Sequence, residues 1–156
     1  MNSILKNILG IIVLVIILLL TVGLLFNNLT KKSFYEESGE IKVKGISNRV
    51  NIYKSELGVT QIFAENENDM YFSLGYMHAQ DRLWQMDLAR RVAEGRLSEI
   101  LGKDVLDYDI LFRTIAINKT AAKQYEKLSL KSKSILSAYC SGVNSFIEAN
   151  SKNLPL

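Results

Sequence analysis

The hydrophobic pattern divides the chain into an apolar amino-terminal segment, a short polar stretch and a longer part whose hydrophobic period changes along its length. Residues 8–26 are nineteen consecutive uncharged residues, nearly all Ile, Leu or Val. A helix of about 20 apolar residues spans the hydrocarbon core of a bilayer. The pattern therefore predicts one transmembrane helix within residues 1–30.

The same segment has some features of a secretory signal peptide, because Lys6 precedes its apolar core. The run is longer than the usual signal core of about 7–15 residues, and residues 27–32 contain no small-x-small cleavage site, which favours a retained anchor. Positive charges on both sides, Lys6 before the run and Lys31 and Lys32 after it, leave the orientation open. We expect a single-pass membrane protein with its folded part outside the cytoplasm, or a secreted protein if the segment is removed.

Residues 31–40 are polar and predict a spacer, and residues 41–156 predict a folded domain. Three short runs at residues 41–43, 50–53 and 59–64 are rich in strand formers and are separated by turn residues. They predict an antiparallel meander of two or three strands.

From residue 66 onward the pattern becomes helical. Asn66 or Asn68 can cap a helix with Met70, Leu74 and Met77 on one face. A second helical segment is predicted over residues 80–94, ending at Gly95. Further helices are expected over residues 103–115, 120–128 and 132–150, the last with a stripe of Ile135, Tyr139, Val143 and Ile147.

Charge and composition argue against nucleic-acid binding, an intrachain disulfide and a metal site. The net charge of +3 is distributed along the sequence, so a nucleic-acid partner is not expected. Cys140 is the only cysteine, which excludes an intrachain disulfide, and it is predicted to be a small buried hydrophobe. No Cys/His cluster has the spacing of a metal site, so neither metal ligands nor cofactor-binding residues are assigned.

The chain contains no recognised catalytic motif, and we assign no catalytic residue. His78 is the only histidine, and a buried imidazole held by hydrogen bonds is the preferred interpretation. Asp87 lies three and four positions before Arg90 and Arg91, which in turn lie within reach of Glu94. Because an aspartate beside arginine stays ionised, these residues predict a structural ladder on a helix packed on several sides, rather than an acid/base pair.

A succession of short motifs carries a more specific signal. In chain order the motifs are Leu57-Gly58-Val59, Asp69, Leu74-Gly75-Tyr76-Met77-His78-Ala79-Gln80-Asp81-Arg82-Leu83-Trp84-Gln85-Met86-Asp87, Arg90-Arg91, Gly95-Arg96-Leu97-Ser98-Glu99, Leu101-Gly102, Asp109 to Arg113, and Ala138-Tyr139-Cys140-Ser141-Gly142-Val143-Asn144. In this order and spacing they resemble the early α-chain of the penicillin acylase family, which includes penicillin amidases, cephalosporin acylases and acyl-homoserine lactone acylases. Thr60 and Gln61 stand where many relatives have His or Pro.

The resemblance implies an α+β fold: part of a four-layer αββα amino-terminal-nucleophile hydrolase, here two or three short strands followed mostly by helices and preceded by the transmembrane helix. Family members cleave themselves into α and β chains, and the new β-chain amino-terminal serine is both the nucleophile and, through its α-amine, the base. In this chain no glycine is followed by Ser, Thr or Cys, so no such cleavage site is present. The nucleophile, and the residues through which family members often bind calcium, are expected downstream of residue 156.

The sequence therefore predicts the amino-terminal part of an amide hydrolase that is inactive without its β-chain, whether the chain is a fragment, a truncated product or a subunit with a separately encoded partner. Substrates implied by the resemblance are acylated compounds such as β-lactam antibiotics or acyl-homoserine lactones. The alternative from another class is a non-catalytic, membrane-tethered helical binding module.

Overall fold

The computed structural model describes residues 3–31, 38–151 and 154 of the chain, with side chains described from residue 6 to residue 27 and from residue 38 onward. Two compact units are present, one formed essentially by residues 1–39 and the other by residues 40–154.

The first unit is a single long helix, α1 (Ser3–Lys31). Within its residues 6–27 an 18-residue window has a mean hydropathy of 3.3, so by length and composition this helix can cross a membrane, although a signal sequence would meet the same criterion. The one hydroxyl in its middle, on Thr21, donates to the main-chain oxygens of Ile17 (2.9 Å) and Leu18 (2.8 Å). That bond satisfies a polar group that lipid could not.

The second unit begins with a two-stranded antiparallel hairpin, β1 (Asn51–Lys54) and β2 (Thr60–Phe63). Gly58 occupies the left-handed region in the turn (φ 76°), and its N–H donates to the carbonyl of Ser55 at 2.8 Å. The pairing places Ile52 opposite Ile62 and so sets which side chains share a face. The two-strand alternative is confirmed, whereas residues 41–43 form no strand because no described strand lies beside them.

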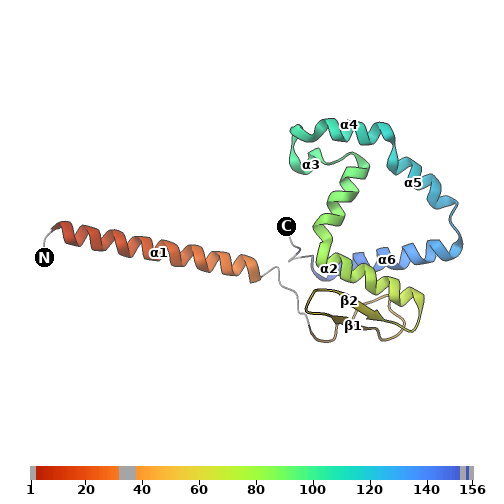
Figure 1. Ribbon diagram of the computed structural model, residues 1–156, viewed down its shortest axis with the longest axis horizontal. Helices are drawn as coiled ribbons and strands as arrows, with labels where there is room; N and C mark the ends of the chain where they lie inside the picture. The colour runs from red at the N-terminus through yellow and green to blue at the C-terminus, as the bar shows by residue number, and fades with distance from the viewer. Residues whose placement is uncertain (1–2, 32–37, 152–153, 155–156) are drawn as a thin grey trace. The chain divides into compact units, whose positions relative to one another are not determined.

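The hairpin is followed by the long helix α2 (Glu67–Glu94), which both predicted helical segments share. The predicted caps are confirmed: the Asn66 side chain accepts from the N–H of Asp69 at 2.8 Å, and Gly95 ends the helix in the left-handed region. Arg82 lies outside helical geometry (φ −144°, ψ 23°), so α2 is kinked there. Figure 1 shows the resulting bend, with the first half of α2 beside the hairpin and the second half leading to α3.

Four shorter elements and one long helix complete the unit. They are α3 (Ser98–Leu101), the 3-10 turn η1 (Lys103–Val105), α4 (Leu106–Ile115), α5 (Ile117–Glu126) and α6 (Leu130–Ala149). The three predicted helices are present with shifted ends, and α3 was not expected because four residues are too few to show a period. Ala116 joins α4 to α5 as the one described non-glycine residue with a positive φ, 58°.

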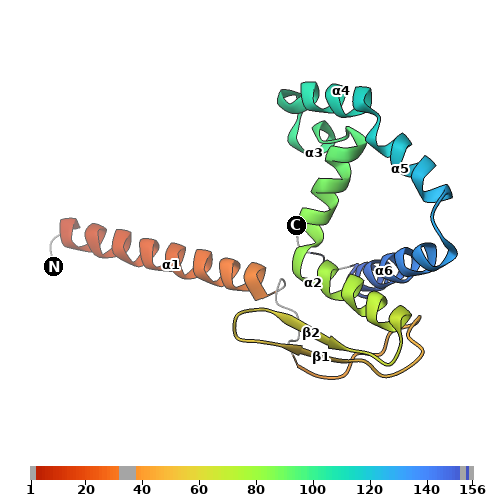
Figure 2. The same cartoon turned by 45° about the vertical axis from the view of Figure 1, so that its right-hand side comes forward.

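The core of the unit lies where α6 crosses the first half of α2, as Figures 1 and 2 both show. Phe72, Ala79 and Phe146 are its fully buried apolar side chains, and the rings of Tyr76 and Phe146 meet edge to face at 5.4 Å. Gly75 and Gly142 allow the approach: a Cβ on Gly75 would overlap the carbonyl of Tyr139, and one on Gly142 would overlap that of Phe72.

The stripe predicted on α6 does not coincide with the face of α6 that packs against α2. Tyr139, Gly142 and Phe146 face α2, whereas Cys140 points away and is exposed. The prediction that Cys140 is buried is wrong, because Cys140 lies about 100° around the helix from Tyr139. Leu136, four residues earlier on the same face, is also exposed.

Candidate functional site

A concave site among the described residues lies at the kink of α2, against the hairpin turn. Its volume is about 220 Å³, and it is lined by Gly58, Thr60, Leu74, Met77, His78, Asp81 and Arg82. Arg82, where α2 departs from helical geometry, is part of this lining.

His78 reaches this site from α2, but it has no nucleophile as a partner. Its Nδ1 lies 3.0 Å from the Tyr139 hydroxyl, and the two rings meet edge to face at 5.8 Å. Burial, followed by the neighbouring Cys140, raises the pKa of Tyr139, so the phenol stays neutral. The prediction of a hydrogen-bonded imidazole is confirmed, but the prediction of a buried one is wrong, because His78 lies at the open edge of the crossing.

Asp81, the acidic residue of the same site, is held in an ion pair with Lys54 of β1 at 2.7 Å. This bond ties the hairpin to α2 just before the kink. Asp81 is therefore engaged in holding two elements together.

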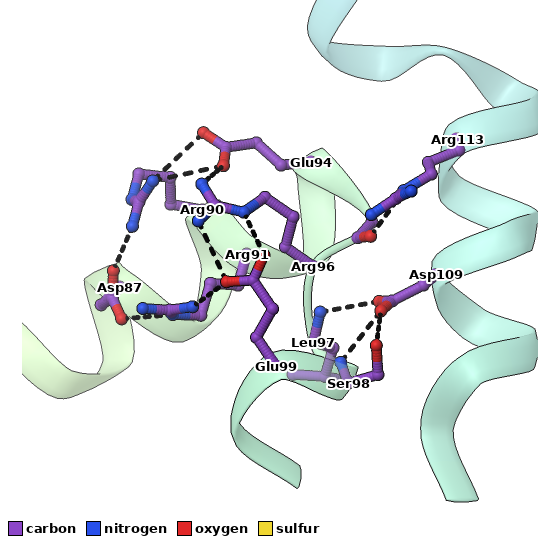
Figure 3. Close-up of polar contacts among 11 residues, drawn as sticks. Asp87, Arg90, Arg91, Glu94, Arg96, Leu97, Ser98, Glu99, Asp109 and Arg113 are labelled. Atoms are coloured by element: carbon purple, nitrogen blue, oxygen red, sulfur yellow. Dashed lines mark hydrogen bonds and ion pairs between the residues drawn. The ribbon is translucent and has the colours of Figure 1, made fainter. Parts of the chain in front are cut away.

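A larger polar cluster follows the kink, where α2 ends and the chain turns into α3 (Figure 3). Asp87 accepts from Arg90 (2.6 Å) and from Arg91 (2.7 Å), as the sequence predicts. Arg91 also reaches Glu99 of α3 at 2.8 Å. Arg96 closes the cluster by donating to Glu94 (2.9 Å) and Glu99 (2.8 Å).

The electrostatics of this cluster favour permanent ionisation. Hydrogen bonds from Arg91 and then Arg90 lower the pKa of Asp87, and hydrogen bonds from Arg96 lower that of Glu99. Bonds to Glu99 and Glu94 raise the pKa of Arg96. Groups that do not change charge near neutral pH do not transfer protons, so the predicted structural role agrees with this geometry.

The packing predicted around this part of α2 is wrong for the unit as described. Trp84 is 47% exposed, and Arg90 is also on the surface. The described residues cover the second half of α2 only in part, through packing against α4 and α5 and the ion pair of Arg91 with Glu99 of α3.

Two buried carboxylates, to which the sequence assigns no role, hold the loops on either side of α2. Asp69 is 1% exposed and accepts from the N–H groups of Ser47 and Asn48, both at 2.9 Å. Burial alone would raise the pKa of Asp69, but these bonds and one from the Asn66 amide outweigh it, so the pKa is lowered.

Asp109 repeats the arrangement at the other end of α2. Its carboxylate accepts from the N–H groups of Leu97 (2.7 Å) and Ser98 (2.9 Å) and from the Ser98 hydroxyl (2.5 Å). Burial opposes ionisation, but the Ser98 hydroxyl, both N–H groups and the charge of Arg113 together lower the pKa of Asp109. Arg113 donates in turn to the carbonyl of Gly95 at 2.8 Å, so α4 secures the end of α2.

No group of three or more His, Cys, Asp or Glu residues with metal-binding geometry occurs in the described part of the chain. The ion pairs and carboxylate hydrogen bonds of the described residues can hold loop backbone in place and set the directions of the helices. The signal for both buried aspartates was available in the sequence as an Asp in the first turn of a helix, but which loops they hold depends on tertiary contacts.

Comparison with known proteins places the chain among the acylase hydrolases. Residues 49–156 match the family model described as penicillin amidase. The penicillin acylase 2 proenzyme of Pseudomonas sp. is 40% identical over 119 residues, which are 76% of this chain and 15% of the proenzyme. The acyl-homoserine lactone acylase QuiP of Pseudomonas putida is 36% identical over 118 residues, which are 76% of this chain and 14% of that protein.

A solved structure agrees with these relatives. The thermostable penicillin G acylase from Alcaligenes faecalis matches with a TM-score of 0.60 at 31% identity, covering 67% of this chain and 55% of that chain. Because the family model covers residues 49–156, more than half of the 156 residues, this chain belongs to the penicillin amidase family. The chain spans about one seventh of the length of the curated relatives it matches.

Proposed function

We propose that this chain is the amino-terminal part of an acylase that hydrolyses the carbon–nitrogen bond of acylated substrates, such as β-lactam antibiotics or acyl-homoserine lactones. The single observation that carries the proposal is the family match over residues 49–156. The substrate classes come from the names of relatives, which are penicillin acylases and acyl-homoserine lactone acylases.

In this proposal the chain supplies scaffold and the chemistry resides elsewhere in the precursor. The nucleophile is a serine at the amino terminus of a β-chain, whose own α-amine, with an ordinary pKa of about 7.7–8.0, accepts the hydroxyl proton near neutral pH. His78 stays bonded to Tyr139 and takes no part. Calcium, where the complete enzyme binds it, is held by residues outside this chain.

The partner in this proposal is the β-chain, and the exposed apolar side chains of the second unit support it. Trp84 is 47% exposed, Leu111 50% and Ile115 54%. Burying one such side chain contributes about 1.5–3 kcal/mol, so a partner that covers several of them binds firmly.

The test is amide hydrolysis by the chain with and without the downstream part of its precursor. We expect residues 33–156 alone to release no product from a chromogenic phenylacetyl or fatty-acyl amide, and to behave like their own His78→Ala variant. Activity should arise on co-expression with the β-chain and be lost when the β-chain serine is replaced by alanine. Turnover by residues 33–156 above the His78→Ala level would contradict the proposal, and a complex that forms but stays inactive would favour a binding module.

The proposal includes a retained membrane anchor, supported by the length and composition of residues 6–27. A span of this kind is held by apolar burial and not by surface charge, so the protein should stay in the membrane pellet after carbonate or high-salt extraction. The second unit then lies on the extracytoplasmic side. Release at intact mass would refute the anchor, and release of a product shorter by about 25 residues would identify a signal peptide, for which this length is typical.

A further inference from the structure

Helix α5 (Ile117–Glu126) is the most sharply divided amphipathic surface of the second unit. Counted at 100° per residue, Ile117, Ala121 and Tyr125 lie on one face, and Leu128 continues that face into the following turn. Lys119 and Lys123 lie on the opposite face.

The basic face of α5 extends beyond the helix. Lys119, Lys123 and Lys127 recur at intervals of four residues, and all three are exposed. Within the described part of the chain none of the three takes part in an ion pair, whereas Lys131 pairs with Glu67. Residues 117–133 contain five lysines and one glutamate, a net charge of +4, which exceeds the +3 of the whole chain. Residues 41–54 carry another +4, with four basic residues and no acidic one, so positive charge is dense around α5 and is also present elsewhere in the unit, in line with the prediction that it is distributed along the sequence.

The apolar face of α5 is largely uncovered by the rest of its unit. Tyr125 is 47% exposed, Ile117 38% and Leu128 37%, and every residue from 121 to 130 is exposed. Figures 1 and 2 show α5 bridging the end of α4 and the start of α6, and apart from these neighbours it makes only a small contact with α2. Such a helix stays accessible to a partner that can cover apolar side chains and accept positive charge.

We propose that α5 docks on an anionic lipid surface, with its apolar face in the headgroup region and its lysines balancing lipid charge. Lysines on one face and large apolar residues on the other are what an interfacial helix requires. The inference rests on the membrane anchor of the proposed function, because α1 supplies the bilayer at short range. Nine residue steps separate Lys31, the end of α1, from Glu40, the start of the second unit, and they reach at most about 30 Å.

Tethering makes a weak surface interaction effective. A compact unit of this size has a radius of gyration of about 13 Å, which is well below the reach of that connection, so the unit can turn on its tether and present α5 to the bilayer. Each lysine near an anionic surface strengthens binding roughly fivefold, which for three lysines amounts to about a hundredfold. That gain is screened by salt, and it is absent on a zwitterionic surface.

The experiment uses the full chain reconstituted in phosphatidylcholine vesicles with or without the anionic lipid phosphatidylglycerol. An environment-sensitive fluorophore is attached at position 121 in a variant carrying Ala121→Cys and Cys140→Ser. The matched control label is on the native Cys140 of the unmodified chain, which is exposed on α6. Carbonate-resistant flotation of every sample establishes separately that α1 is inserted.

We expect quenching of the position-121 label by nitroxide lipids to be several-fold greater in anionic than in zwitterionic vesicles. High salt, or the triple variant K119E/K123E/K127E, should remove the difference. The charge-matched variant K42E/K44E/R49E should retain it. Equal quenching of the position-121 label in anionic and zwitterionic vesicles would overturn the proposal. Quenching of the Cys140 label as strong as that of the position-121 label would also overturn it. A position-121 label that responds only to the added β-chain would assign the surface to a protein partner instead. Failed flotation would refute the anchor, independently of α5.

Discussion

The hydrogen bonds that the Asp69 carboxylate accepts give the most direct test of the structure. Its buried carboxylate holds the loop before the hairpin through the N–H groups of Ser47 and Asn48, one on each oxygen. Asp69→Asn keeps the shape but removes the charge, and its NH₂ group must face one of the two donors. Loss of a hydrogen bond to a charged, buried acceptor costs about 1.5–3 kcal/mol.

That free energy corresponds to a roughly tenfold to hundredfold increase in local opening of residues 47 and 48. Amide hydrogen exchange of the full chain in lipid or detergent measures it at these two positions. Asp109→Asn is the reciprocal control: it should speed exchange at residues 97 and 98 and leave 47 and 48 unchanged, while Asp69→Asn does the reverse. Exchange at residues 47 and 48 that changes less than threefold in Asp69→Asn would refute the assigned role.

The stabilisation by these Asp69 hydrogen bonds depends on pH with a defined sign. The pKa of Asp69 is lowered below its ordinary value of 3.8, so the folded state binds the proton less readily than the unfolded state. The stabilisation is fully present above pH 3.8 and is lost as the pH falls further, through the folded-state pKa. Protection of residues 47 and 48, corrected for intrinsic exchange, should therefore be constant from pH 7 to about pH 4 and fall at lower pH, whereas in Asp69→Asn it should be lower throughout and lack this dependence.

Two further predictions concern the packing of the second unit. Gly142→Ala would place a Cβ 2.8 Å from the Phe72 carbonyl carbon and 2.9 Å from the Tyr76 nitrogen, so overpacking of about 1–3 kcal/mol should exceed the gain in helix propensity of about 1 kcal/mol. Limited proteolysis should be faster than for Ser141→Ala, its exposed neighbour; equal rates would argue against the close crossing. Residues 33–156 without a β-chain should show helical circular dichroism but no cooperative melt, and a reversible two-state melt would favour an independent module.

Local features of the fold could be predicted from the sequence because each rests on neighbouring residues. Asn66 and Gly95 mark the ends of α2 by their own side-chain chemistry, and the turn at Gly58 separates the two strands. Asp87 meets Arg90 and Arg91 because helical spacing alone brings them together.

Features that depend on distant segments could not be predicted in this way. Cys140 and Tyr139 are adjacent in the sequence, yet only the position of α2 decides that one is exposed and the other packed. Whether His78 is buried depends on where α6 crosses, and the run at residues 41–43 lacks a strand beside it. The catalytic assignment required the family resemblance, since periodicity carries no information about a nucleophile in another segment.

The glycine contact between α2 and α6 also has a consequence for the order of events during synthesis. Gly75 and Gly142 are 67 positions apart, so the crossing cannot form until the ribosome has released α6. At about 5–20 residues per second, α2 waits roughly 3–13 s after its own translation for its packing partner. The apolar α1 emerges earlier still, so in the proposed function membrane targeting precedes the assembly of the core, and the first half of α2 must remain soluble in the interval.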